Sequence, residues 1–180
     1  MDYTTAVALI LPGDHSIKVN SIREKYDKAY ERWMPHINFM YPFFPVDDFD
    51  GVHEKLQEAF KEFTSFDLEF DDIGYFVQKT RDKKKIATYH MCVKDDNKLQ
   101  EIFKILTSVL PEVKVRKVFR PHLTLGQCPR ADADTVVEDV KELLFLEKKM
   151  VVHIDGIYMI NRSKDDNSVP FSVNKHIQFC

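Results

Sequence analysis

Hydrophobic residues along the chain follow two spacings, and each spacing predicts one kind of element. Alternating or uninterrupted apolar runs predict β-strands, whereas apolar residues three or four positions apart predict amphipathic helices. Predicted strands cover residues 3–12, the stretch around His36, residues 66–78 and 86–93, the stretch around His122, and residues 151–160 and 171–179. Predicted helices begin at Ser16, at Asp48 or Asp50, after Asn97, and at Thr135, where Thr135 and Glu138 match a capping box.

The order of these elements repeats along the chain. A β-α-β-α-β series occurs twice and is followed by one further strand, and His122 follows His36 by close to half the chain length. Such an internal duplication predicts two similar lobes related by an approximate two-fold axis. We therefore predict an α+β fold in a single bilobal domain, residues 1–180, whose halves span approximately 1–80 and 85–180. Both histidine strands would meet at a central cleft, with the helices on the outer faces.

Two short stretches carry the candidate chemistry. Residues 32–43 read RWMPHINFMYPF and residues 119–127 read FRPHLTLGQ. Proline favours extended geometry in the residue before it, and strand side chains alternate between faces. His36 and Asn38 would therefore share one face, and His122 and Thr124 would share one face of the second strand. A histidine and a hydrogen-bonding side chain two residues apart, presented twice, form a candidate acid–base pair with two phosphate anchors.

Composition and charge narrow the class of protein. The 44% hydrophobic content and fourteen phenylalanines indicate a globular chain, and 180 residues suffice for one sizeable core. The net charge of −3 disfavours a protein that coats long nucleic acid, and we expect no DNA partner. It remains compatible with a nucleotide or a single RNA end bound in a local pocket.

Cysteine usage and apolar runs indicate the compartment. The three cysteines are widely separated and form no C-x-x-C pair, which is typical of a reducing environment. The first residues lack the pattern of a signal peptide, and no apolar run is long enough to span a bilayer. We predict a cytoplasmic protein without membrane association and leave a nuclear location open.

The two motifs resemble those of a known superfamily. Pro-His-Ile-Asn and Pro-His-Leu-Thr-Leu-Gly are similar to the paired H-x-T/S-x motifs of the 2H phosphoesterases. The flanks from Ile22 to Phe43, and Ile160-Asn161-Arg162 followed by Pro170-Phe171, resemble the 2′-5′ RNA ligase-like branch. The resemblance covers the whole chain in element order and is specific at the motifs and their flanks. It implies a metal-independent phosphodiesterase, with no organic cofactor, that acts on 2′,3′-cyclic phosphates or 2′-5′ linkages, or runs the same chemistry in reverse as a ligase.

The resemblance also implies roles for individual residues. His36 and His122 would act as general acid and base, because histidine titrates near neutral pH, and their near-symmetry leaves open which is which. Asn38 and Thr124 would donate hydrogen bonds to the phosphate. Asn38 stands where threonine or serine is commonest; its amide keeps a donor but is bulkier than a hydroxyl, so the substrate preference stays open.

Other candidates are weaker. Arg120 shares the face of His122 and could reach the phosphate or simply be solvated. Tyr41 and Tyr89 could stack on a base, although aromatic residues on apolar strand faces more often belong to the core. The lysines of residues 83–85 could guide an RNA strand or merely solvate the loop of residues 79–85.

Two alternatives belong to other classes of function. The chain could be a non-catalytic module of the same fold that binds nucleotides or RNA ends, or a scaffold for which the histidines are incidental. A zinc site is disfavoured, because the chain has neither H-E-x-x-H nor paired-cysteine spacing, and we assign no metal ligands. The sequence leaves the exact substrate, the base preference and the oligomeric state open.

Overall fold

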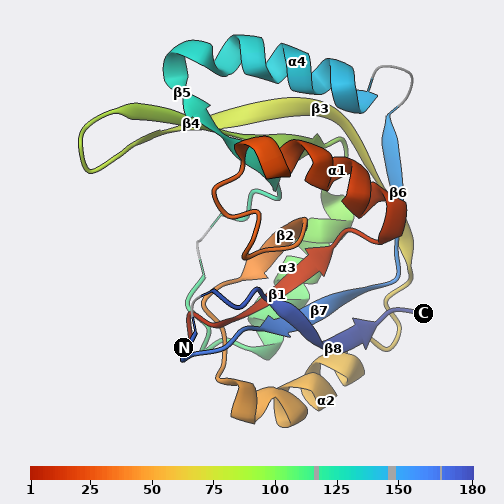
Figure 1. Cartoon of the computed structure of the whole chain (residues 1–180). Coiled ribbons are helices and arrows are strands. Elements are labelled where there is room, and N and C mark those ends of the chain that lie inside the picture. The colour runs from red at the N-terminus through yellow and green to blue at the C-terminus, as the bar shows by residue number, and fades with distance from the viewer. Residues whose placement is uncertain (116–117, 146–148, 167) are drawn as a thin grey trace.

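The computed structural model describes residues 1–115, 118–145, 149–166 and 168–180. Within these residues, four helices and eight strands are connected as Figure 1 shows. The helices are α1 (Gly13–Tyr26), α2 (Phe49–Phe60), α3 (Asn97–Val109) and α4 (Ala133–Phe145). The strands are β1 (Thr5–Ile10), β2 (His36–Met40), β3 (Phe66–Lys79), β4 (Lys85–Val93), β5 (Leu123–Pro129), β6 (Met150–Ile154), β7 (Gly156–Asn161) and β8 (Ser172–Gln178). Short 3₁₀ turns at Val46–Asp48 and Arg130–Asp132 precede α2 and α4.

The strands form two four-stranded antiparallel sheets with the same plan. The first sheet has the order β2-β1-β7-β8 and the second has the order β5-β4-β3-β6. Each histidine motif thus lies on an edge strand, β2 or β5, and the two edge strands contact each other. The prediction of an α+β fold with two similar lobes is confirmed.

The predicted division of the chain into halves 1–80 and 85–180 is wrong as a description of the lobes. β3 and β4 lie on either side of that boundary, yet they pair with each other as a hairpin of the second sheet. The first sheet takes β1 and β2 from the start of the chain and β7 and β8 from its end. A polar loop between two strands is a turn signal as well as a boundary signal, and here it closes a hairpin.

The single strand predicted for residues 151–160 is two strands in different sheets. β6 pairs with β3 and β7 pairs with β1, with Asp155 between them. Gly156 occupies the switch, where a Cβ atom would lie 2.2 Å from Nε2 of His176 and 2.5 Å from the carbonyl oxygen of Ile177. A glycine is required there because any larger residue would displace β8. The apolar pattern hid the switch, because it continues through both strands.

Two predicted helix starts also differ from the structure. α4 begins at Ala133, which places Thr135 inside the first turn and removes it from the capping position. α1 begins at Gly13, three residues before Ser16. The apolar stripe of α3 is confirmed, because Leu99, Ile102 and Leu106 are buried, whereas Tyr26 of α1 and Leu143 of α4, predicted members of their stripes, are exposed.

The helices cover the sheets in a way that ties the lobes together. α4 packs on β3, and α2 packs on β8 and on α3 (Figure 1). α1 connects two strands of the first sheet but packs on β5 of the second. One large cluster of buried apolar residues spans both sheets. The helices therefore fix the position of one lobe relative to the other. Within the described residues, no helix has the length and apolar content to cross a membrane.

Candidate functional site

The first motif forms β2 with the predicted alternation of faces. Ile37 and Phe39 are buried in the main core, whereas His36 and Asn38 are partly exposed on the opposite face. Asn38 pairs across the sheet with Ala8, and His36 pairs with Ile10. The alternation arises because successive strand residues point to opposite faces and the apolar ones enter the core.

The second motif begins β5 in the same manner. Leu123 and Leu125 are buried, and His122 and Thr124 are partly exposed on the other face. Because β2 and β5 are contacting edge strands, the two histidines come close enough for the charge of His122 to act on His36. The structure thus brings both motifs together at the line where the two sheets meet.

Both histidine rings are held by the same backbone contact. Nδ1 of His36 lies 2.7 Å from the carbonyl oxygen of Met34, and Nδ1 of His122 lies 2.8 Å from that of Arg120. A carbonyl oxygen only accepts, so Nδ1 carries the proton in both rings. In each motif the carbonyl belongs to the residue before the proline, whose extended geometry the proline favours. The X-Pro-His sequence thereby fixes the tautomer and leaves Nε2 as the nitrogen that can accept a proton.

Asn38 contacts Nε2 of His36. Its Nδ2 atom donates to Nε2 of His36 over 2.9 Å, an arrangement that requires an unprotonated Nε2. Its Oδ1 atom is buried and has no hydrogen-bond partner among the described residues. The amide expected to bind phosphate is therefore directed at the histidine in this structure. Thr124, its counterpart in the second motif, pairs across the sheet with His90.

The indole ring of Trp33 covers one face of His36. The ring of Trp33 stacks on that of His36, with centroids 4.6 Å apart, and also on the ring of Phe171 at 3.8 Å. Burial lowers the pKa of His36 from its usual 6.5 to about 4; the Met34 carbonyl opposes this change and the positive charge of Arg23 adds to it. His36 is therefore uncharged at neutral pH.

A buried polar network connects the two motifs. Arg23 and Asp27, which are 1% and 8% exposed, form an ion pair at the end of α1 with 2.8 Å between Nη2 and Oδ2. Oδ1 of Asp27 accepts from Nε2 of Gln127 on β5 over 3.1 Å. Oε1 of Gln127 in turn accepts from the backbone N–H of Lys28 over 3.1 Å. The network thus ties the segment that leads into β2 to the strand that carries Thr124.

Sequence reasoning missed this network and also a third histidine. The Arg23–Asp27 spacing of four residues within a helix was a signal for the ion pair. That histidine is His90 on β4, which is only 7% exposed and whose ring lies edge-to-face with His122, centroids 5.4 Å apart. Its ring also stacks on Phe76 at 4.3 Å. Burial, with a smaller contribution from His122, lowers the pKa of His90 to about 4.

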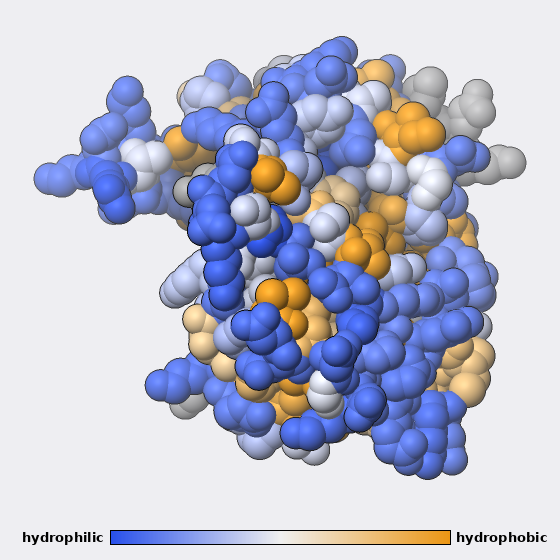
Figure 2. Space-filling view, turned by 60° about the horizontal axis from the view of Figure 1, so that its bottom comes forward, coloured by the Kyte–Doolittle hydropathy of each residue, from blue (hydrophilic) through white to orange (hydrophobic). Residues whose placement is uncertain are grey.

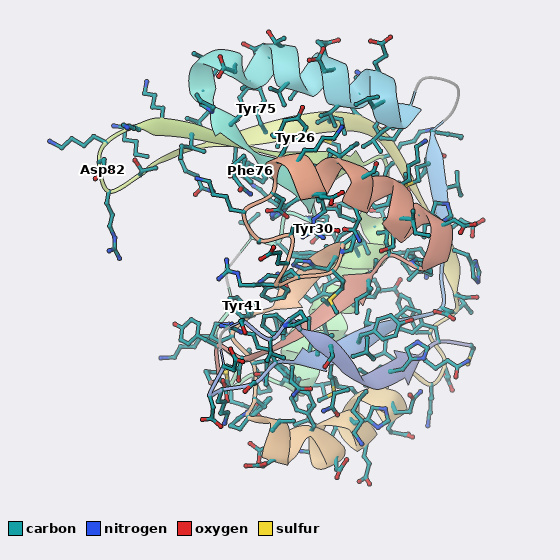
Figure 3. The ribbon with its side chains drawn as sticks, in the orientation of Figure 1. Tyr26, Tyr30, Tyr41, Tyr75, Phe76 and Asp82 are labelled. Carbon is teal, nitrogen blue, oxygen red and sulfur yellow. The ribbon has the colours of Figure 1, made fainter. Side chains whose placement is uncertain are left out.

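The weaker candidates have different positions. Tyr89 is fully buried against Tyr26, so the prediction that it stacks on a base is wrong; it points to the core face of β4. Tyr41 is 42% exposed and lies edge-on to Trp33. Arg120 is exposed and contributes its carbonyl to His122. Figure 3 shows Phe76 on the second sheet and Tyr41 beside the first on the same side of the molecule. Within the described residues, no group of three or more His, Cys, Asp or Glu side chains could hold a metal ion.

Comparisons with known proteins identify relatives of this chain. The family model described as the 2′-5′ RNA ligase superfamily matches residues 11–166. A protein of Staphylococcus haemolyticus, named as a candidate phosphoesterase, is 27% identical over 122 residues, which cover 67% of this chain and 69% of that protein.

Several solved structures share the fold at low sequence identity. A Thermus thermophilus protein superposes with a TM-score of 0.64 at 10% identity over 97% of both chains. Escherichia coli LigT, solved with 3′-AMP, gives a TM-score of 0.63 at 14% identity over 98% of both chains. Usb1 of Kluyveromyces marxianus gives 0.52 at 10% identity over 94% of this chain and 97% of its own. LigT has also been solved with ATP, with phosphate and with NADP⁺.

Proposed function

The chain belongs to the 2′-5′ RNA ligase superfamily, and we propose that it hydrolyses 2′,3′-cyclic phosphates or 2′-5′ phosphodiester bonds of nucleotides or RNA termini. His36 and His122 are the acid–base pair of this proposal. The observation that carries it is the shared backbone contact, which protonates Nδ1 of both rings and leaves two Nε2 atoms for proton transfer. The 3′-AMP and phosphate bound by the structurally similar LigT support a nucleotide substrate.

The different surroundings of the two histidines support a division of roles. A ring with a pKa of about 4 is almost entirely unprotonated at neutral pH, so His36 is suited to begin the reaction as the base. His122 then begins as the acid. Nε2 of His36 takes a proton from water as the water oxygen bonds to phosphorus. The bond from phosphorus to one ribose oxygen breaks, and Nε2–H of His122 protonates that oxygen.

The neighbouring side chains take binding roles in this scheme. Before His36 can accept a proton, the Asn38 amide must leave Nε2, and it can then donate to a non-bridging phosphate oxygen. The hydroxyl of Thr124 donates to another phosphate oxygen, and the exposed guanidinium of Arg120 balances its charge. Tyr41, exposed beside Trp33, offers a surface on which a base can stack.

The test is turnover of a 2′,3′-cyclic nucleotide and a 2′-5′-linked oligoadenylate in EDTA. His36→Ala and His122→Ala should each lose roughly 10²–10⁴-fold in rate, the usual contribution of acid–base catalysis. His153→Ala, at an exposed histidine, is the matched control and should retain wild-type activity. Retention of activity by both motif variants would refute the mechanism, and loss of wild-type turnover in EDTA would refute its metal independence.

One observation favours a second candidate, a module that binds the same ligands without turnover. The Asn38 amide occupies the nitrogen that the base would use. If wild type binds a cyclic nucleotide tightly but turns over neither substrate, and Asn38→Thr is equally inert, the binding function is the correct one.

A further inference from the structure

The hairpin of β3 and β4 projects beyond the rest of the molecule. Its strands pair without interruption from Ile73↔Met91 to Lys79↔Lys85, and Figure 3 shows Asp82 at its tip. Figure 1 shows no other element beside that end, and Figure 2 shows a hydrophilic projection on the same side. The residues from Val77 to Lys85 are all exposed except Thr80, which is half-buried. The end of the hairpin is thus accessible from both faces.

This projection concentrates positive charge in a chain that is negative overall. Its end carries five cationic side chains and a single acid, Asp82, whereas the whole chain has a net charge of −3. The cationic residues are Lys79, Arg81, Lys83, Lys84 and Lys85. Lysines elsewhere, such as Lys94 and Lys141, form ion pairs with carboxylates. In the described part of the chain, no ion pair includes any of these five residues.

Three of these cationic residues occupy positions at which a lysine lowers the stability of the fold. Lys79 and Lys85 are directly opposite each other in the ladder, where like charges are destabilising. Lys83 has a φ angle of 61°, a conformation in which glycine or asparagine is less strained than lysine. Hydrogen bonds between Thr80 and Lys84 close the turn and hold this arrangement. These hydrogen bonds do not require lysine at any of these positions, so the choice of cationic residues indicates a role outside the fold.

The hairpin is continuous with the candidate site. Phe76 on β3 lies edge-to-face with His122, ring centroids 5.1 Å apart. Lys79 follows three residues later on the same strand, which corresponds to about 10 Å. A polyanion that ends at the histidine pair would therefore pass the charged end of the hairpin.

We propose that the hairpin end, residues 79–85, binds the phosphate backbone of a single-stranded RNA whose terminus occupies the His36–His122 site. This inference rests on the proposed function and names its substrate as an oligonucleotide rather than a free mononucleotide. Cationic side chains bind single strands mainly through their phosphates, and partly exposed aromatic residues such as Phe76 can stack on bases. An anionic membrane fits less well, because the hairpin tip carries no large apolar side chain to insert.

Charge-removing substitutions test the proposal in the full-length protein. The variant combines Lys79→Gln, Lys84→Gln and Lys85→Gln. The control removes three exposed lysines from α2, its C-terminal end and α3 with Lys55→Gln, Lys61→Gln and Lys104→Gln. The probe is a labelled single-stranded RNA of about twelve nucleotides, with the dissociation constant measured by fluorescence anisotropy over a series of salt concentrations.

The hairpin variant should bind at least about tenfold more weakly at low salt. Its plot of log affinity against log salt should be shallower by about two, from ~0.7 per lost phosphate contact on a single strand. The ratio of kcat/KM for an oligonucleotide to that for a mononucleotide should also fall. Lys83→Gly, which relieves the left-handed backbone, should weaken binding without lowering the melting temperature. The control should match wild type in every measurement.

The outcomes separate this inference from the proposed function. Equal RNA binding by the hairpin variant and wild type, or equal weakening in the control, overturns the binding role even if both turn over substrate. Hairpin-dependent binding to phosphatidylserine vesicles in place of RNA overturns it as well. Hairpin-dependent RNA binding without turnover of any substrate supports the binding role and refutes the proposed function.

Discussion

The two histidine motifs share one geometry but have different surroundings. In both, the carbonyl of the residue before the proline accepts from Nδ1–H and so leaves Nε2 without a proton in the neutral ring. His36 then stacks on Trp33 and receives the Asn38 amide, whereas His122 borders the rings of His90 and Phe76. The duplicated X-Pro-His sequence therefore sets the tautomer of both rings, and the neighbouring side chains differ between the two motifs; in the proposed mechanism this difference assigns the base to His36 and the acid to His122.

The largest expected effect is the loss of hydrolysis rate in variants of the two histidines. A change of leaving group then distinguishes the general acid from the general base. His36→Gln and His122→Gln should each slow hydrolysis of a 2′,3′-cyclic nucleotide by roughly 10²–10⁴-fold. With an aryl phosphodiester that releases nitrophenolate, which leaves without a proton, His122→Gln should recover most of its rate and His36→Gln should not. Steady-state kinetics on both substrates measures this. If only His36→Gln recovered its rate on the aryl phosphodiester, His36 would be the acid and His122 the base.

The position of one motif relative to the other also depends on the buried polar network that connects them. Asp27→Ala leaves the Arg23 guanidinium buried and unpaired, which typically costs about 3–5 kcal/mol of unfolding free energy. Denaturant unfolding measures this cost. Glu101→Ala, which removes one side of the exposed Lys98–Glu101 pair, is the control and should change stability by less than about 1 kcal/mol. Similar small losses in both variants would show that the buried pair does not hold α1 against β5.

The parts of the site that sequence could predict are those determined by local pattern. The alternation of Ile37 and Phe39 with His36 and Asn38 follows from the two-residue period of a strand, and it is confirmed. The same pattern could not place Tyr89, because β4 has apolar residues on both faces and only the sheet's position decides which face is core.

That local pattern could not predict which segments far apart in the sequence contact each other. His90 meets Thr124 only through the register of β4 and β5, which shifts at a bulge between Tyr89 and His90. The division of residues 151–160 between two sheets likewise depends on which strands lie beside β6 and β7. Strand pairing of this kind joins residues far apart in sequence, so the type of the elements was predictable, whereas their partners and the division of residues 151–160 into two strands were not.

His90 gives the second motif its own response to pH. Its pKa of about 4 in the folded chain lies below the ordinary 6.5, so the unfolded chain binds more protons between these values. Above pH 6.5, His90 therefore does not lower the free energy of unfolding. As the pH falls toward 4, the free energy of unfolding decreases by an amount on the order of 3 kcal/mol. His90→Phe should flatten this part of the stability curve, as followed by denaturant unfolding between pH 4 and 7.

Phe76→Leu provides the control for that measurement. It changes the packing around the same ring but removes no titrating group, so it should lower stability by a similar amount at every pH. If His90→Phe kept the full acid destabilisation of wild type, the loss would have to come from other groups, His36 among them.

The smallest expected effect concerns Asn38, the position at which the two motifs differ most in sequence. Its N–H donor favours the unprotonated form of His36, because a protonated Nε2 has no lone pair to accept it. Asn38→Thr exchanges this amide for the shorter hydroxyl of the second motif, and the pKa of His36 should rise toward its usual value. The acidic limb of the pH profile of kcat/KM should then move to higher pH, with only a several-fold change in rate at neutral pH. The reciprocal variant Thr124→Asn should leave that limb in place, because Thr124 neighbours the histidine assigned as the acid. A shift of the acidic limb in Thr124→Asn instead would mean that His122, and not His36, is the base.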